Sequence, residues 1–150
     1  MKIGCLIASL AFLLSATAGA EEEATFKVRF GVVEYDSASR EKVIRETSAI
    51  PFRDCRTGAA YGYSVEHNAG RRFSTHAVFY PPSPVKKVDE GLWGTAETSP
   101  TTGLTADSLS FVGKGISEFC FTDSDPRGEW KAVIFINAVR FSAVAFQTAD

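Results

Sequence analysis

The residues whose chemistry is easiest to recognise are His67, His76 and the aspartates of Asp123-Ser124-Asp125. Imidazole and carboxylate groups bind metal ions or exchange protons with a substrate. The two histidines fall in alternating runs, however, and their parity places them on opposite faces. The aspartates lack the spacing of a calcium loop and precede Pro126, which favours an ordinary turn. A hydrolase or metal-dependent enzyme using His67, His76, Asp123 and Asp125 is therefore an alternative only. No catalytic residue, metal ligand or cofactor is assigned.

The cysteines offer a second kind of chemistry. The chain contains Cys5, Cys55 and Cys120, and Cys5 lies inside the apolar N-terminal segment described below. An even number of cysteines in an exported chain favours a disulfide, so we expect Cys55 and Cys120 to be bridged. The bridge would close a loop of about 65 residues and remove roughly 4 kcal/mol of chain freedom from the unfolded state. Two buried thiols are the alternative.

Arginine and tryptophan side chains supply the candidate binding residues. Arg71 and Arg72 stand together, with Arg53 and Arg56 earlier in the chain, and guanidinium groups suit carboxylate or phosphate partners. Trp93 lies in a long unpatterned stretch, where an aromatic ring either pins the loop to the core or meets a partner. We therefore name Arg71, Arg72 and Trp93 as candidate binding residues.

The N-terminus predicts export. Residues 1–20 combine Lys2, an apolar run from Ile3 to Leu14 and small residues up to Ala20, which is typical of a cleaved signal peptide. The apolar run is too short to span a bilayer, so no membrane span is expected after cleavage. Residues 21–150 then form one domain in the periplasm or outside the cell. The formal net charge of the whole chain is −2, which argues against nucleic acid as a partner.

Alternating apolar residues predict the elements that must position these side chains. Strands are expected near 25–35, 60–67, 71–80, 109–112 and 116–122, and residues 41–50 form an extended segment or a short helix. A three-residue turn suggests a hairpin in which Val65 faces Phe73. A last hairpin turns at Asn137-Ala138, with Trp130 as its core anchor. About seven strands with no long helix predict an antiparallel β-sandwich, with a small closed barrel as the alternative.

Three stretches resemble an uncharacterised family of small exported bacterial domains with an immunoglobulin-like sandwich. They are Phe30–Tyr35, then Thr47–Ile50 followed by Ala60–Tyr63, and Gly128–Trp130 together with the closing run Phe141–Phe146. The resemblance implies fold and compartment, and it implies no activity and no site residues.

Three functions are consistent with this sequence. The first is an exported, non-enzymatic module that binds a protein or envelope component through its sheet edges or the stretch 81–106. The second is the enzyme described above, which requires its four side chains to converge in a pocket. The third is a small-ligand carrier, which requires a closed barrel with an open interior.

Overall fold

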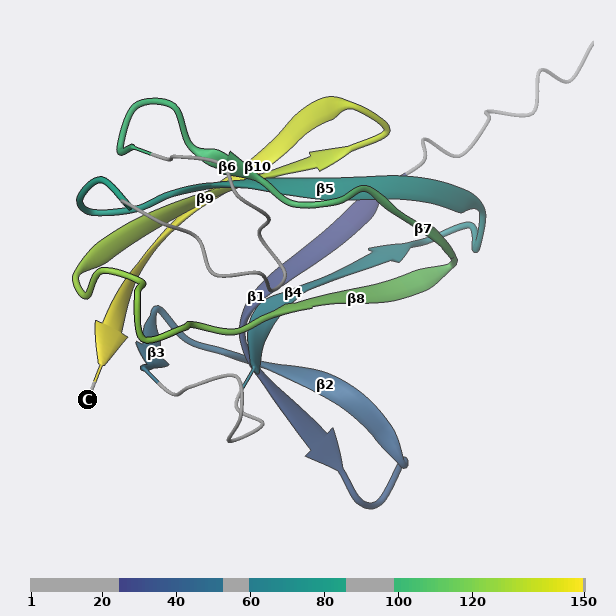
Figure 1. The fold of residues 1–150 in the computed structure, drawn as a ribbon. Coiled ribbons are helices and arrows are strands. Elements are labelled where there is room, and N and C mark those ends of the chain that lie inside the picture. Colours follow the sequence, from purple (N-terminus) through teal and green to yellow (C-terminus); the bar gives the residue numbers. More distant parts are fainter. Residues whose placement is uncertain (1–24, 53–59, 86–98, 150) are drawn as a thin grey trace, which may run out of the picture.

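The computed structural model describes residues 25–52, 60–85 and 99–149, and this part of the chain is built from ten β-strands (Figure 1). The strands are β1 (Phe26–Asp36), β2 (Glu41–Glu46), β3 (Ala49–Pro51), β4 (Ala60–His67), β5 (Arg72–Tyr80), β6 (Leu104–Thr105), β7 (Leu109–Val112), β8 (Lys114–Phe119), β9 (Glu129–Ile136) and β10 (Val139–Ala149).

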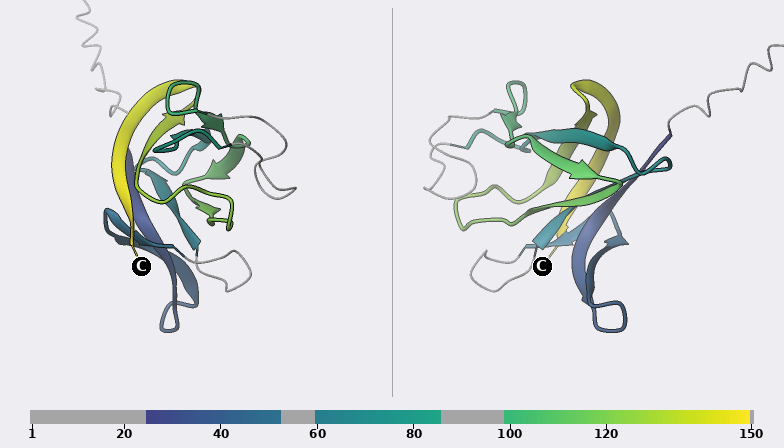
Figure 2. Two further views of the ribbon diagram at one scale, coloured as in Figure 1. Left: turned by 60° about the vertical axis from the view of Figure 1, so that its left-hand side comes forward. Right: turned by 90° about the vertical axis from the view of Figure 1, so that its right-hand side faces the viewer.

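The strands form two layers that face each other across an apolar interior (Figures 1 and 2). One layer has the order β2-β1-β4-β8, and the other has the order β7-β5-β9-β10-β3, with β6 beside β5. The β7–β8 hairpin passes from one layer to the other, because β7 pairs with β5 and β8 pairs with β4. In the described ranges, the terminal strands β2 and β3 do not pair with each other, so the sheet is not closed. The predicted antiparallel sandwich is confirmed, and the barrel alternative is wrong.

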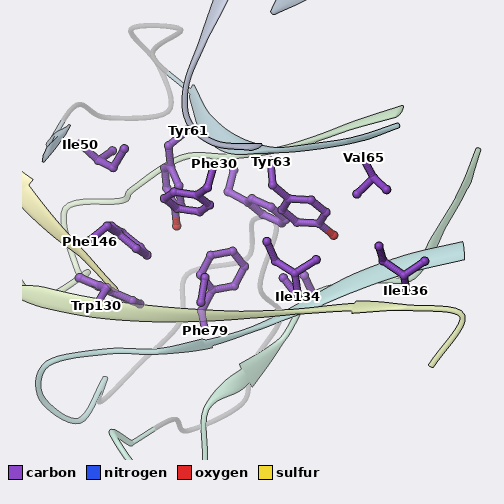
Figure 3. Packing of buried hydrophobic residues seen from close by; sticks show 14 of the residues in the cluster. Phe30, Ile50, Tyr61, Tyr63, Val65, Phe79, Trp130, Ile134, Ile136 and Phe146 are labelled. Carbon is purple, nitrogen blue, oxygen red and sulfur yellow. The ribbon is translucent and has the colours of Figure 1, made fainter. Parts of the chain in front are cut away.

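Aromatic residues fill the interior, as the period-two pattern predicts. Tyr61 and Tyr63 point inward from β4, and Tyr61 meets Phe79 from the facing layer (Figure 3). The Tyr61 and Phe79 ring centroids lie 6.0 Å apart, and edge-to-face pairs of this kind add to the gain from burial. Burial raises the pKa of the Tyr61 phenol well above its usual value, with the Asp125 carboxylate adding to the effect. The predicted core anchor Trp130 is also buried.

One predicted hairpin is wrong. The turn at Asn68-Ala69-Gly70 predicts that β4 and β5 pair with each other, but they lie in different layers, and β4 pairs instead with β1 and β8. Their apolar faces do match, because both point into the same core. The Thr75 hydroxyl donates to the Tyr63 hydroxyl at 3.1 Å between the layers. Alternation shows which side of a strand is buried, but it does not distinguish a neighbour in the sheet from a strand opposite it.

Residues 41–46 are extended, which excludes the helix considered for this segment. The short strands β3 and β6 were not predicted individually. β3 pairs in parallel with the end of β10, from Gln147↔Ala49 to Ala149↔Pro51. It carries the chain from one layer to the other, so that β2 and β3, close in sequence, lie at opposite ends of the strand order.

Two glycines on neighbouring strands permit close approaches between backbones. Gly31 and Gly62 are directly opposite each other on β1 and β4. A Cβ on Gly31 would overlap the carbonyl oxygen of Arg45, and a Cβ on Gly62 would overlap that of Ser117. Another backbone therefore comes too close at both positions for any residue except glycine.

The turn between β9 and β10 contains a strained residue. Asn137 and Ala138 both have positive φ, of 50° and 63°, as a type I′ turn requires. Asn137 is held there, because its Oδ1 accepts from the Ser74 N–H at 3.0 Å and its own N–H donates to the Ser74 carbonyl at 2.9 Å. Ala138 carries the cost of a left-handed backbone without such compensation.

We therefore expect Ala138→Gly to raise the free energy of unfolding by about 1 kcal/mol, as the relief of left-handed strain exceeds the added flexibility of glycine. Urea denaturation followed by circular dichroism measures the change. Asn137→Gly serves as the matched control, and it should destabilise the protein because the bond to Ser74 is lost. Equal effects of the two substitutions would contradict this explanation.

Candidate binding edge

The histidines and aspartates of the enzyme alternative do not share a pocket. His67 is buried at the end of β4, where its Nδ1 accepts from the Ala69 N–H at 3.0 Å. His76 lies on the face of β5 that points away from the core, where its ring stacks on Phe135 with the centroids 4.7 Å apart. One imidazole thus points into the core and the other away from it, so they lie on opposite faces of their strands, as predicted. Among the described residues, no three His, Cys, Asp or Glu side chains gather closely enough to hold a metal ion.

The Asp123–Asp125 segment forms a turn between β8 and β9. The Asp125 carboxylate accepts from the Thr122 N–H at 2.6 Å and from the Thr122 hydroxyl at 3.1 Å. The Asp125 N–H in turn donates to the Thr122 carbonyl at 3.0 Å. This is the aspartate-closed turn that the sequence favours, and the Asp125 carboxylate is engaged within it.

Only some of the other candidate residues lie within the described structure. Arg71 and Arg72 are exposed at the start of β5. Trp93 and Cys55 lie outside the described residues, and Cys120 is half-buried directly after β8. The Cys55–Cys120 bridge and the binding role of Trp93 therefore stay predictions. No helix in the described residues is long and apolar enough to cross a membrane.

Among the described residues, the candidate for a binding site is the edge of β10. One side of β10 pairs with β9 along Val139–Gln147, whereas β3 covers the other side only at Gln147–Ala149. In the part of the chain that the structure describes, no strand pairs with the outer side of Val139–Phe146. An uncovered edge of this kind presents backbone groups that can pair with another chain.

The hydrogen bonds at the covered end of β10 show which way the backbone groups of its uncovered part point. The Gln147 N–H donates to the Ser48 carbonyl at 2.7 Å, on the outer side of β10. The Thr148 N–H donates to Gly128 at 3.0 Å, on the inner side. Because backbone groups alternate along an antiparallel strand, the N–H and C=O groups of Ala143 and Ala145 point to the uncovered side. They are the hydrogen-bonding groups available to a partner.

The composition of this edge does not protect it. Proteins usually block exposed edges with charges, prolines or bulges. Along Phe141–Phe146 (FSAVAF) there is no charge and no proline, and the one bulge lies near the turn, between Arg140 and Ser142. The part of the β1 edge that no described strand covers, by contrast, carries Lys27 and Arg29. β10 is therefore the better strand acceptor of the two.

The bulge also exposes an aromatic side chain beside the edge. Phe141 has no partner in the β9 register and is 46% exposed, and its ring lies 6.0 Å from that of Phe26 on β1. This contact begins a seam between β10 and β1. Further along the same seam, Phe146 meets Phe30 at 4.9 Å. The edge of β10 is thus bordered by apolar rings from both layers.

Comparisons with known proteins show a likeness to a solved structure. No protein-family model matches the chain, and no curated protein matches it. Among solved structures, the chain is similar to PA1606 from Pseudomonas aeruginosa, with 18% identity and a TM-score of 0.49, over 87% of this chain and 100% of that one. That neighbour is described as an immunoglobulin-like protein. Membership of the exported family that the sequence resembles stays a prediction.

Proposed function

We propose that the chain is an exported, non-enzymatic binding module that accepts an extended segment of a protein partner along the edge of β10. The single observation that supports this is the uncovered, uncharged edge Phe141–Phe146 with the backbone groups of Ala143 and Ala145 directed outward. Strand addition uses main-chain hydrogen bonds for affinity and alternate side chains for specificity.

The surroundings of the edge define the chemistry of the partner. A strand added beside β10 would direct every second side chain toward the interior, where it meets the seam between Phe141 and Phe26. Apolar side chains at those positions would cover the exposed part of Phe141. The outward face of β10 offers only small side chains between Ser142 and Phe146. The expected partner is therefore an extended segment, apolar at alternate positions and without charges at its centre.

A peptide-display experiment tests this proposal. Displayed peptides of about ten residues, long enough to follow the edge, are selected on the immobilised domain, and the most enriched peptide is synthesised. We expect hydrogen exchange at the Ala143 and Ala145 amides to slow when this peptide binds. Ala145→Pro should weaken binding at least tenfold, because it removes an N–H that faces the partner and not β9.

The matched control is Ala145→Ser, which keeps the N–H and should bind within about twofold, since one neutral surface change is nearly silent. Thermal unfolding of each variant verifies that it is folded. Peptide protection on β1 or on another surface, with β10 amides unchanged, would refute the proposal. A dimer of the chain itself that is lost in Ala145→Pro would instead identify a second copy as the occupant.

Export and the Cys55–Cys120 bridge belong to the same proposal. They are supported by the residue pattern of 1–20 and by the even cysteine count after it. A partner in the periplasm or outside the cell fits both. Appearance of the chain without its first 20 residues in the exported fraction, with no free thiol after denaturation, is the expected result.

A further inference from the structure

A second site lies on the other side of the molecule, beneath β2. The β1–β2 hairpin bends across the outer face of the β1–β4–β8 layer (Figure 1). Two ion pairs connect it to β8: Lys42 with Glu118 at 2.6 Å, and Glu41 with Lys114 at 3.9 Å. Between β2 and the layer there is a half-open hollow of about 60 Å³. A space of that size admits a small molecule of a few heavy atoms.

The lining of this hollow is cationic. Lys27, Arg29 and Lys114 supply three positive charges and Glu66 one negative charge, in a chain whose overall formal charge is −2. Glu66 is the direct cross-strand neighbour of both Lys27 and Lys114, so it partly compensates the two lysines. The neighbour of Arg29 on β4 is the neutral Ser64. Within the described residues, Arg29 makes no ion pair, and its guanidinium is available to an anion.

The rest of the lining is apolar, and it favours one class of anion over another. Val43 and Ile44 from β2 and Ile116 from β8 form an apolar side to the hollow. A guanidinium group pairs with a carboxylate through two parallel hydrogen bonds, and a hydroxyl such as that of Ser64 can donate another. A doubly charged phosphate would meet both the apolar wall and the Glu66 carboxylate. A carboxylate with a short aliphatic chain satisfies each part of the lining.

We propose that this hollow binds a short-chain monocarboxylic acid, with the carboxylate on Arg29 and Ser64 and the aliphatic end against Ile44 and Ile116. The site is independent of the β10 edge, since it lies on the outer face of the opposite layer. The ion pairs from Lys42 and Glu41 hold β2 as its wall. The hollow therefore depends on the folded hairpin as well as on the sheet.

Nuclear magnetic resonance titration of the labelled protein with butyrate, at constant ionic strength, tests the proposal. We expect saturable shifts at the amides of Arg29, Ser64 and Ile116. Arg29→Gln should weaken binding at least tenfold, because it removes the bidentate partner of the carboxylate. Glu66→Gln should tighten it about threefold, because it removes a nearby negative charge. Butan-1-ol, which has the chain but no carboxylate, should leave the amides unshifted.

The matched control is Arg140→Gln, which removes an exposed arginine from β10 in the other layer and should leave butyrate binding unchanged. Opposite effects of Arg29→Gln and Glu66→Gln, with an unchanged control, establish the site. Phosphate shifting the same amides with equal affinity would show a general anion effect and overturn the proposal. So would unsaturable butyrate shifts, or equal losses in Arg29→Gln and Arg140→Gln.

Discussion

Replacing Trp130 with alanine is expected to lower the free energy of unfolding by about 3–5 kcal/mol, the range found when a buried aromatic ring is truncated. The side chain is 5% exposed, and its ring lies 5.6 Å from that of Phe121 and 6.3 Å from that of Phe146. Its indole N–H also donates to the Pro126 carbonyl at 3.0 Å, which connects β9 to the preceding turn. Urea denaturation followed by far-ultraviolet circular dichroism measures the loss.

Two further variants separate the apolar contact of Trp130 from its hydrogen bond, and a core ring from an exposed one. Trp130→Phe keeps most of the apolar contact and loses the bond to Pro126, so it should cost about 1–2 kcal/mol. Phe141→Ala truncates a ring that is 46% exposed and should cost markedly less than Trp130→Ala. If Trp130→Ala cost no more than Phe141→Ala, the assignment of Trp130 to the core would be wrong.

Gly62→Ala is expected to be as damaging, with a loss of more than about 3 kcal/mol, although it adds only one methyl group. That methyl would occupy the position of the Ser117 carbonyl oxygen on β8. A backbone group held in a strand ladder cannot move aside as a flexible side chain would. The sheet must therefore spread between β4 and β8, which disturbs the layer beneath the cationic hollow. Thermal and urea unfolding of the variant measure the effect.

The matched control for Gly62 is Gly70, which lies in the exposed turn after β4. Gly70 has φ of 64°, and a Cβ at this position would meet nothing within 4 Å, so Gly70→Ala carries only the left-handed backbone cost of about 1–2 kcal/mol. Gly62→Ala should exceed this by a clear margin. Comparable losses at both positions would show that the close approach of β4 and β8 is not what requires glycine.

Much of the fold could be predicted because the alternation of apolar and polar residues along a strand shows which of its faces is buried. The inward residues of β1, β4 and β5 are those of one parity, including Phe30, Tyr61 and Phe73. A period of two with a strong apolar bias allows little besides a strand with one buried face. The opposite orientations of His67 and His76 followed from the same parity.

The candidate sites could not be predicted, because each depends on strand order. The β10 edge is open only because β3 covers Gln147–Ala149 and stops there, and β3 is three residues long. The hollow requires Arg29, Ser64 and Ile116 on three neighbouring strands, and β2 above them. The absence of charge in Phe141–Phe146 was visible in the sequence, but it indicates a binding edge only once that strand is known to be uncovered.

Local alternation and apolar content are enough to show that this chain forms strands, which side of each strand is buried, and that Trp130 belongs to the interior. Three other features came from the folded arrangement: β4 and β5 face each other across the core, β10 is left with an open side, and β2 covers a cationic hollow. These arrangements depend on contacts between distant segments, where several pairings bury the same residues and packing of the whole selects among them.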